Sequence, residues 1–311
     1  MKKISIVSTC LNEEDTIENF EKLVSLELQK YHKEFDYEII VSDNNSTDNT
    51  INKLINICNN NKKFKVILNK KNYGPDRSQF SSILRATGDI IIGLNIDLQE
   101  GQEIIGKFVE AWKKGSKFAV GKITKRKENF FIKYLKKYFY LAFNKFSRTK
   151  LINNTALFMI DQENKKILES INDPDPFTRG LLMELLEYPE IIPIIKNERK
   201  AGNSKSNLSY FYSLGIMGFV KMSNAPMRII TFLGFILSII FLLIGLFFLI
   251  YKLISWDNFA LGIAPLIILL CLISSFLLLS LGIIGEYILV LLSLSRKLPL
   301  VSKKKEINFE D

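Results

Sequence analysis

Short apolar runs alternate with longer amphipathic segments along the first two thirds of the chain. Runs at residues 4–7, 37–41 and 64–68 have the length of strands, and apolar residues at helical spacing follow the first two of them. Strands that alternate with helices predict a parallel sheet with right-handed crossovers. Further strands are expected at residues 90–94, 118–121, 156–160 and 191–195, and further helices at residues 78–86, 103–114 and 179–186.

The stretch that organises the chain is residues 86–99, ATGDIIIGLNIDLQ. Its apolar run is typical of a strand buried on both faces, and Asn95, Asp97 and Gln99 follow it at alternate positions. Residues i, i+2 and i+4 of an extended segment point the same way, so these side chains are expected to converge on a hard cation. A strand that simply runs into a polar turn is the alternative.

Polar side chains also occur at the other predicted strand ends. Glu13 lies in a polar segment after the first strand, Asp43 and Asn44 follow the second strand, and Asp89 adjoins the central run. The carboxyl ends of parallel strands share one edge of a sheet, where α/β proteins bind ligands. This set is therefore expected to bind a nucleotide, with a metal ion on its diphosphate. Each residue alone also fits an ordinary capping role in a loop.

A second group of candidates is basic and lies later in the chain. Its members are Lys122, Lys125, Arg126, Arg179, Arg199 and Lys205. Arginine donates paired hydrogen bonds to phosphate and lysine acts as a point charge, so this group is expected to receive a phosphate. The alternative is that these side chains merely touch anionic lipid.

Two charge-free stretches dominate the last third of the chain. Residues 229–251 and 259–285 are each long enough to span a hydrocarbon core of about 30 Å. Basic residues flank the pair, so the positive-inside rule predicts a transmembrane hairpin with both termini in the cytoplasm. The expected localisation is therefore the cell inner (plasma) membrane, as a multi-pass protein. Two buried helices of a soluble protein are the alternative.

The expected organisation has four parts. A cytoplasmic α/β domain spans residues 1–207, a juxtamembrane amphipathic segment 208–227, the membrane hairpin 228–295 and a basic cytoplasmic tail 296–311. Within the first part, the aromatic residues and lysines of 130–146 predict a helix that lies in the membrane interface. An ordinary packed helix with snorkelling lysines is the alternative.

Composition narrows the class of protein further. The 42 basic residues exceed the 32 acidic ones, and 48% of the chain is hydrophobic. This balance favours a membrane-associated protein with a basic cytoplasmic side over a nucleic-acid binder. Three cysteines without paired spacing indicate neither a disulfide framework nor a zinc site. The single histidine, His32, argues against a histidine-based triad or metal cluster.

The motifs, taken in order, resemble those of the polyprenyl-phosphate glycosyltransferases, a membrane branch of the inverting family-2 glycosyltransferases. The similarity covers nearly the whole chain. LNEE (11–14) resembles an opening YNEE element, DNNSTDNT (43–50) a DDGSTDGT element, ATGD (86–89) an A-x-GD element and NIDLQ (95–99) a DADLQ element. RGL (179–181), AGNSKS (201–206) after Arg199, IGEY (284–287) and RKLPLV (296–301) resemble later elements of the two-span members.

The resemblance implies a GT-A fold and an enzyme that moves a sugar from a nucleotide donor, with UDP favoured, onto an undecaprenyl-type polyprenyl phosphate with inversion. By position, it assigns the nucleotide to Glu13, Asp43, Asn44 and Asp89, and Mg²⁺ or Mn²⁺ to Asn95, Asp97 and Gln99. It assigns the acceptor phosphate to Arg126, Arg179, Arg199 and Lys205, and chemistry to Asp97, Arg179, Arg199 and Lys205. The implied partners are the nucleotide sugar, the lipid phosphate and the membrane, without nucleic acid, and self-association is left open.

The chain also departs from the family pattern. Asn95 stands where a metal-binding aspartate is usual, and Asn44 replaces the second aspartate of the nucleotide element. ALFM (156–159) stands where many relatives have an acidic DFRL segment, and MELLEY (183–188) replaces the usual aromatic and glycine after RGL. A neutral ligand at position 95 is expected to weaken the metal site. The alternative function is therefore a catalytically weak or inactive relative that binds nucleotide sugar or lipid within a membrane glycan-assembly complex.

Overall fold

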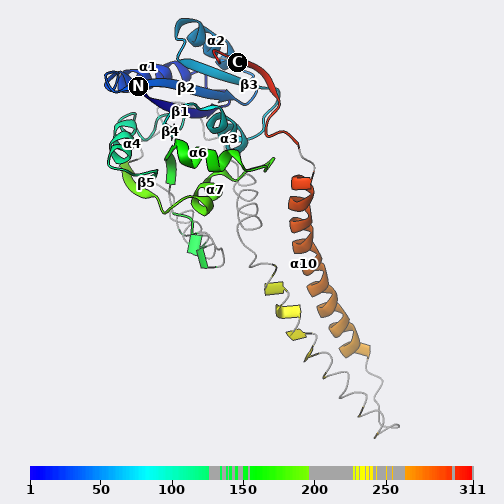
Figure 1. Ribbon diagram of the computed structural model, residues 1–311. Helices are drawn as coiled ribbons and strands as arrows, with labels where there is room; N and C mark the ends of the chain where they lie inside the picture. The colour runs from blue at the N-terminus through cyan, green and yellow to red at the C-terminus, as the bar shows by residue number, and fades with distance from the viewer. Residues whose placement is uncertain are drawn as a thin grey trace.

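The computed structural model describes residues 1–125, 150–152, 155–195, 263–295 and 298–309, with scattered residues between 134 and 145 and between 227 and 254. An α/β part contains one sheet with helices packed on it (Figure 1). A long helix, α10 (Ile263–Ser295), begins far from the sheet and runs back toward it. The last described residues then lie beside the sheet, so the chain returns to the part in which it began.

One eight-stranded sheet organises the α/β part. Its strands are β1 (Lys2–Cys10), β2 (Phe35–Asp43), β3 (Phe64–Asn69), β4 (Ile90–Gly93), β5 (Phe118–Lys125), β6 (Thr155–Asp161), β7 (Glu190–Ile195) and β8 (Lys303–Ile307). They lie in the order β7-β5-β6-β4-β1-β2-β3-β8. β1 to β4 run parallel, β7 is parallel to β5, and β6 and β8 are antiparallel to their neighbours. The carboxyl ends of β1 to β4 therefore share one edge.

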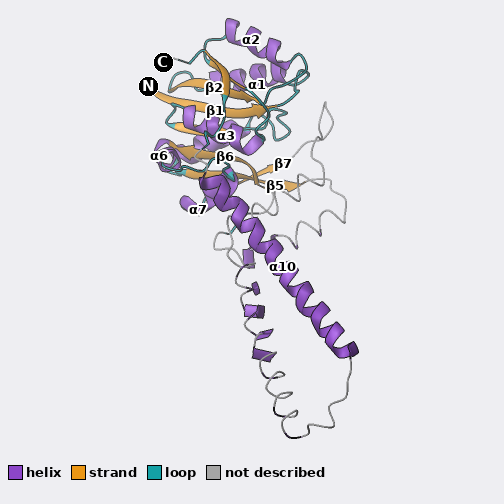
Figure 2. Cartoon of the chain, turned by 90° about the vertical axis from the view of Figure 1, so that its right-hand side faces the viewer, coloured by secondary structure: helices purple, strands orange, loops and turns teal. Residues whose placement is uncertain are grey.

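Helices cover both faces of the sheet (Figure 2). They are α1 (Ile17–Gln29), α2 (Thr50–Asn60), α3 (Pro75–Arg85), α4 (Ile104–Lys113), α6 (Gln162–Glu169) and α7 (Thr178–Leu185). α1, α2 and α4 bury Phe20, Leu54 and Phe108 in one core. α3 and α7 bury Phe80 and Leu182 in the other core, to which α6 also contributes. The result is a three-layer arrangement with the sheet in the middle.

Successive residues of the central strands divide between these two cores. In β4, Ile90 and Ile92 belong to the core under α1, α2 and α4, and Ile91 belongs to the opposite core. All three are fully buried. A strand covered on both faces needs apolar residues at every position, which is why its sequence is a continuous run. The expected α/β architecture with a mainly parallel sheet is confirmed.

The sequence pattern does not predict β8. Residues 303–307, which were expected in a basic tail, pair antiparallel with β3 and complete that edge of the sheet. Lysines suit an outer strand because their charge discourages pairing with further chains. Beyond β8, Asn308 donates through Nδ2 to Cys58 O and to Phe64 O, both at 2.8 Å. The segment after α10 is therefore an integral part of the α/β fold.

The expected membrane hairpin is not shown. In the part of the chain that the structure describes, no helix is both long and apolar enough to cross a membrane. This finding contradicts the predicted localisation as a multi-pass protein of the inner membrane, because a crossing helix needs about 20 predominantly apolar residues. The second expected span, 259–285, overlaps α10. The expected segments 229–251 and 130–146 are described only at scattered residues, and 208–227 lies outside the described residues except for Met227.

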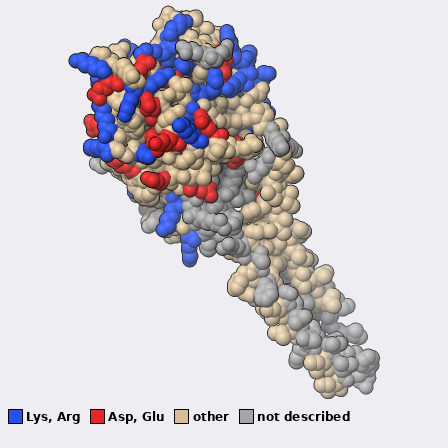
Figure 3. All heavy atoms as spheres, viewed as in Figure 1, with Lys and Arg blue, Asp and Glu red and all other residues tan. Residues whose placement is uncertain are grey.

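Charge is distributed unevenly between the two parts of the molecule. Basic and acidic side chains intermingle over the α/β part, whereas the described atoms of α10 belong to other residue types in the same view (Figure 3). Large apolar side chains are exposed along α10, among them Leu266, Leu270, Leu277 and Leu281. Apart from the exposed Glu286, the described surface of α10 is therefore mainly apolar, whereas that of the α/β part is charged.

Candidate functional site

The loops that follow β1 and β2 are hydrogen-bonded to each other. Asn12 donates its backbone N–H to Ser46 Oγ (2.8 Å), and its Oδ1 accepts the Thr47 N–H (2.7 Å). One residue later, Glu13 donates its N–H to Thr50 Oγ1 (2.8 Å). The LNEE and DNNSTDNT elements therefore form one surface at the carboxyl edge of the sheet, as the parallel strands predicted.

Glu13 lies where this surface meets the start of α1. Its carbonyl oxygen accepts the N–H groups of Thr16 and Ile17, both at 3.1 Å, and its Oε2 accepts the Thr16 hydroxyl at 2.8 Å. The side chain is half-buried, so the carboxylate lies at the border of the loop and not in the core. This position agrees with a nucleotide contact, which stays a prediction.

Asp43, the last residue of β2, is fully buried. Its Oδ2 accepts the Ser46 N–H at 3.0 Å, and its Oδ1 accepts the Ser46 hydroxyl. Cys10 also donates to Oδ1, at 3.6 Å, and burial followed by the charge of Asp43 raises the pKa of Cys10 well above its ordinary value. The carboxylate of Asp43 thus shapes the loop, and because it is fully buried, contact with a nucleotide would require the loop to expose it.

Asn44 is also buried, and it connects β2 to the turn before α3. Its Oδ1 accepts the Tyr73 N–H (3.4 Å) and the Nδ2 hydrogen of Asn69 (3.2 Å), and its Nδ2 donates to Gly74 O (3.2 Å). The Ser78 hydroxyl also donates to Asn44 Oδ1. Sequence reasoning missed Asn69, although its position at the end of β3 follows the same rule that identified the others.

Residues 95–99 form a turn and do not continue β4. Leu98 has a φ of 44°, and its N–H donates to Asn95 O at 3.2 Å. The alternation expected from the sequence is wrong here, because a left-handed residue interrupts the extended backbone. Gln99 Nε2 donates to Asp97 Oδ2 (2.7 Å), whereas Asn95 Nδ2 donates to Glu100 Oε1 (3.1 Å). The structure thus brings Asp97 and Gln99 together and turns Asn95 toward Glu100.

The oxygen donors of this turn suit a metal ion whose coordination a substrate completes. Among the described residues, no three histidine, cysteine, aspartate or glutamate side chains are grouped to hold a metal. Mg²⁺ in nucleotide sites commonly takes one or two carboxylates and completes its shell with phosphate and water oxygens. Asp97 and Glu100 supply carboxylates within one short turn, and Asn95 and Gln99 supply amide oxygens. The set fits a cation shared with a diphosphate.

Asp89 lies at the opposite edge of the sheet. It precedes β4, and its Oδ2 accepts the backbone N–H of Lys3 near the start of β1 (2.7 Å). The prediction that Asp89 joins the nucleotide-binding edge is wrong, because the residue stands at the amino end of its strand. Neighbouring Thr87 donates its N–H and its hydroxyl to Glu38 Oε1, at 2.7 and 3.0 Å. The ATGD element therefore lies at the amino ends of the strands.

Glu38 is the centre of a buried ionic group at this amino edge. Its Oε2 lies 2.8 Å from Lys65 Nζ and 3.0 Å from Lys3 Nζ, and Ser5 donates to its Oε1 at 2.6 Å. Burial alone would raise the pKa of Glu38, but hydrogen bonds from Lys65, Ser5, Thr87 and Lys3 outweigh it and lower the pKa to about 2. This group joins β1, β2 and β3 and belongs to the scaffold.

The ALFM segment, which replaces an acidic element of the family, lies in β6. Phe158 is in register with Gly93 of β4, and both residues are buried. A side chain at Gly93 would collide with the Phe158 ring. The aromatic residue therefore fills space in the core beside the end of β4, where the family pattern has a polar residue.

Two members of the predicted basic group, Lys122 and Lys125, lie in β5. Arg179 is the described one of the four residues that the resemblance assigns to the acceptor phosphate. Its Nη2 donates to Ile152 O at 2.6 Å, and its guanidinium lies 5.6 Å from the centre of the Tyr140 ring. The preceding Thr178 hydroxyl donates to Asp76 O at 3.1 Å, so α7 begins beside the first turn of α3, at the carboxyl edge of the sheet. The other three members, Arg126, Arg199 and Lys205, lie outside the described residues.

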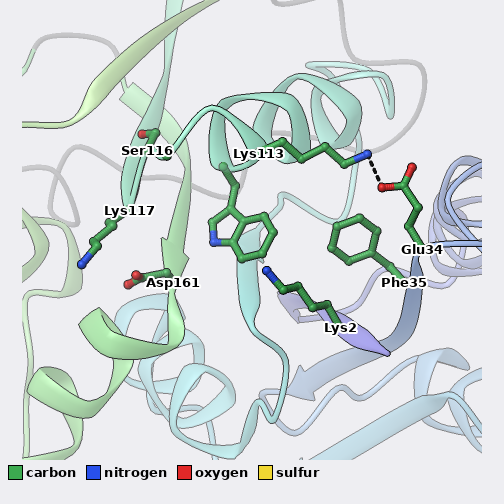
Figure 4. A pocket seen from close by; sticks show the side chains of 9 residues that line it. Lys2, Glu34, Phe35, Lys113, Ser116, Lys117 and Asp161 are labelled. Atoms are coloured by element: carbon green, nitrogen blue, oxygen red, sulfur yellow. Dashed lines mark ion pairs between the residues drawn. The ribbon is translucent and has the colours of Figure 1, made fainter.

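A pocket of about 580 Å³ opens at the amino edge of the sheet (Figure 4). The Lys2 ammonium lies 4.4 Å from the centre of the Trp112 ring, and Lys113 pairs with Glu34 at 2.6 Å. Asp161 also lines the pocket, and burial raises its pKa. Ligands of α/β sheets bind beyond the carboxyl ends of the strands, so this pocket is not the candidate site.

Comparison with known proteins identifies the family. A sequence profile described as Glycosyl transferase family 2 matches residues 5–171. The chain is 28% identical over 291 residues to the prophage bactoprenol glucosyl transferase homologue of Escherichia coli (strain K12), covering 92% of this chain and 93% of that protein. It is 28% identical over 310 residues to an uncharacterised glycosyltransferase, YkcC, of Bacillus subtilis (strain 168), covering 99% and 95% of the two chains.

Among solved structures, glucosyl-3-phosphoglycerate synthase from Mycobacterium tuberculosis, in complex with Mn²⁺, uridine diphosphate and phosphoglyceric acid, gives a TM-score of 0.49. The two chains are 18% identical, and the comparison covers 70% of this chain and 76% of that one.

The profile match extends from β1 to the end of α6 and so includes the joined loops and the Asp97 turn. Because it covers more than half of the chain, the protein belongs to glycosyl transferase family 2 and is a glycosyltransferase with a GT-A-like fold.

Proposed function

We propose that this enzyme transfers a sugar from a nucleoside-diphosphate sugar, preferably a UDP-sugar, to a polyprenyl phosphate, with inversion at the anomeric carbon. The observation that carries the proposal is similarity over 92% of the chain to relatives named bactoprenol glucosyl transferase. These relatives match the chain well beyond the family profile, which ends at residue 171. The similarity to these relatives therefore includes the later part of the chain and its basic residues.

The carboxyl edge of the sheet supports a donor site. Glu13 follows β1, Asp43 ends β2 and Asn44 follows it, and hydrogen bonds join the two loops. The turn that holds Asp97 follows β4, which lies on the other side of β1. In the proposed arrangement the nucleoside lies over the joined loops and the diphosphate lies over the turn. The nucleotide would thus extend across three neighbouring strands.

The turn after β4 supplies the groups for the diphosphate. Asp97, with Gln99 and Asn95, is proposed to hold Mg²⁺ or Mn²⁺. When bound, this ion would offset the negative charge of the leaving diphosphate. Gln99 donates to Asp97 Oδ2 at 2.7 Å and so fixes the orientation of that carboxylate. Preorganised ligands of this kind avoid a reorganisation cost during the reaction.

The acceptor phosphate is proposed to bind Arg179 together with Arg126, Arg199 and Lys205. One of its ionised oxygens attacks the anomeric carbon from the side opposite the diphosphate. The new C–O bond forms as the bond to the diphosphate breaks, and the nucleoside diphosphate leaves with the bonding electron pair. An oxygen that is already ionised needs little help from a general base. This fits a chain whose single histidine, His32, is exposed and bonded to Gln29 O.

The test is transfer of labelled sugar from UDP-glucose, UDP-N-acetylglucosamine, UDP-galactose or GDP-mannose to undecaprenyl phosphate, with Mn²⁺ or with EDTA. We expect labelled lipid from one donor, only with metal, and loss of product in Asp97→Asn. Asp36→Asn is the matched control, because it removes a half-exposed carboxylate at the amino edge of the sheet. It should transfer sugar at the wild-type rate.

Two outcomes would contradict the proposal. Nucleotide binding without transfer from any donor would favour the catalytically weak relative, for which the orientation of Asn95 toward Glu100 is the supporting observation. A product with the same anomeric configuration as the donor, measured from the proton coupling at the anomeric carbon, would exclude inversion.

A further inference from the structure

The end of the described chain runs along the carboxyl edge of the sheet before it pairs with β3. Residues 298–309 are called the C-terminal strap here. The N–H of Lys70, directly after β3, donates to Ser302 O at 2.9 Å. From there β8 continues alongside β3 toward its amino end. The strap therefore touches the chain at the point where β3 gives way to the turn at residues 70–74.

Arg77 binds the strap to the first turn of α3. Its Nε and Nη2 both donate to Leu300 O, at 2.8 and 2.6 Å, and Nη2 also lies 3.3 Å from Pro299 O. Its guanidinium lies 4.8 Å from the centre of the Tyr73 ring. A planar guanidinium that donates to two carbonyls and packs against an aromatic ring has little remaining freedom. Arg77 thus links the strap, α3 and the turn that contains Tyr73.

Asn44 holds the same turn from the other side. Its Oδ1 accepts the Tyr73 N–H at 3.4 Å, and its Nδ2 donates to Gly74 O at 3.2 Å. Gly74 has a φ of 83°, a conformation that glycine adopts readily and other residues rarely do. The turn is therefore fixed between a residue at the end of β2 and a residue that holds the strap.

We propose that the C-terminal strap is a positioning element of the nucleotide-binding site. Through Arg77 it holds the turn at residues 70–74 against Asn44, at the edge where the donor binds. This inference rests on the proposed function, because it gives the strap a part in donor binding. Arg77 acts through the turn and touches no reacting atom. Release of the strap weakens nucleotide binding and leaves the rate from bound donor unchanged.

Arg85 provides a matched control at the other end of α3. It pairs with Glu306 of β8 at 3.1 Å, and its guanidinium lies 4.9 Å from the centre of the Phe309 ring. Arg85 therefore also ties α3 to the strap, but at the end of the helix remote from Tyr73. If the strap only stabilised the fold, substitutions at Arg77 and Arg85 would have the same consequences.

The experiment compares Arg77→Met, Arg77→Lys and Arg85→Met in the full chain. Calorimetric titration with UDP and with GDP, in the presence of Mn²⁺, measures Kd, and initial rates with the donor measure KM and kcat. Arg77→Met should raise Kd and KM about tenfold without changing kcat, because a displaced turn no longer presents the site in its binding geometry. Arg77→Lys should recover part of the loss, since an ammonium can still donate to Leu300 O. Arg85→Met should leave Kd within about twofold of wild type.

Amide hydrogen exchange gives a second readout that needs no nucleotide. Exchange at residues 70–74 should accelerate about tenfold in Arg77→Met and remain at the wild-type rate in Arg85→Met. If Arg77→Met fails to fold, Arg77→Lys provides the same comparison, because it keeps the charge and one donor.

The outcomes separate this inference from the proposed function. If the wild type binds nucleotide and Arg77→Met binds it with the same Kd, the inference about the strap is overturned and the proposed function is not. Equal acceleration of exchange in Arg77→Met and Arg85→Met would reduce the strap to a stabilising segment and would also overturn it. Wild-type protein that binds neither UDP nor GDP would overturn the proposed function and, with it, the role of the strap in donor binding.

Discussion

Glu38→Gln tests whether the ionic group at the amino edge stabilises the sheet. Glu38 is only 1% exposed, and its neighbours Lys3 and Lys65 are themselves partly buried, with side chains 27% and 14% exposed. The substitution keeps the size of the side chain but removes its charge. It leaves two ammonium groups near an uncharged amide, and the loss of one member of a buried ionic group is strongly destabilising.

The pKa of Glu38 sets the expected magnitude. It falls from an ordinary value of 4.5 to about 2 in the folded protein. Each pKa unit corresponds to about 1.4 kcal/mol, so the ionised side chain contributes about 3 kcal/mol to the free energy of unfolding. Because the folded pKa is the lower one, this contribution is fully present above the unfolded value. It is lost as the pH falls from 4.5 toward the folded value.

The assay is urea unfolding of the wild type and of Glu38→Gln at about pH 7, 5 and 3, with the free energy of unfolding extrapolated to water. We expect a difference of about 3 kcal/mol at neutral pH that shrinks at the lowest pH, because Glu38 of the unfolded chain is protonated there while Glu38 of the folded protein is still mostly ionised. Asp36→Asn is the control, because Asp36 and its partner Lys63 are 48% and 47% exposed. Such an exposed pair contributes less than about 1 kcal/mol to the free energy of unfolding. A difference for Glu38→Gln that is equally small, or that does not depend on pH, would refute the reasoning.

Three further substitutions test other parts of the structure. Asp97→Ala should lower the rate of sugar transfer at least about 100-fold. The urea midpoint should stay near that of wild type, because the residue lies in a turn outside the core. Full activity would show that Asp97 is not part of the metal site. Gly88→Ala should lower the free energy of unfolding by about 1–3 kcal/mol, since its Cβ would lie 2.6 Å from Ser5 Oγ. Gly282→Ala, whose Cβ would meet nothing within 4 Å, is the control, and equal thermal midpoints for the two would contradict the clash. Asn308→Ala should lower the free energy of unfolding by about 1–2 kcal/mol and speed amide exchange at the end of α2, because the carbonyls that Asn308 bonds lose their donor. Unchanged exchange would show that water replaces the Asn308 side chain as donor.

The apolar pattern located the strands because the sheet is covered on both faces. The continuous run at residues 90–94 matches β4, and its bulky residues enter two different cores. The parallel arrangement also led correctly to the joined loops after β1 and β2. In these places a local pattern and the tertiary structure require the same residues, so the sequence alone was sufficient.

Side-chain direction at the strand ends could not be predicted in the same way. Asn95 and Asp97 diverge because residues 95–98 form a turn, closed by the bond from the Leu98 N–H to Asn95 O, and nothing in an apolar pattern reports that turn. Asp89 was grouped with the carboxyl edge because its neighbours in sequence are at a strand end, yet the direction of β4 places it at the amino edge. β8, with the sequence KKKEI, has no apolar run. Its conformation depends on pairing with β3, which is remote in sequence.

The pairing of β8 with β3 also orders the events of folding. Asn308 bonds to Cys58 across 250 positions of sequence, and contacts between such distant segments form slowly because a long loop must close first. During synthesis, the strands around the joined loops emerge well before the segment that covers their outer edge. Until α10 has been made and the chain has returned, β3 exposes unpaired backbone groups that attract strands of other chains. A nascent chain that already holds Glu13, Asp97 and Arg179 therefore remains prone to aggregation until its last described strand arrives.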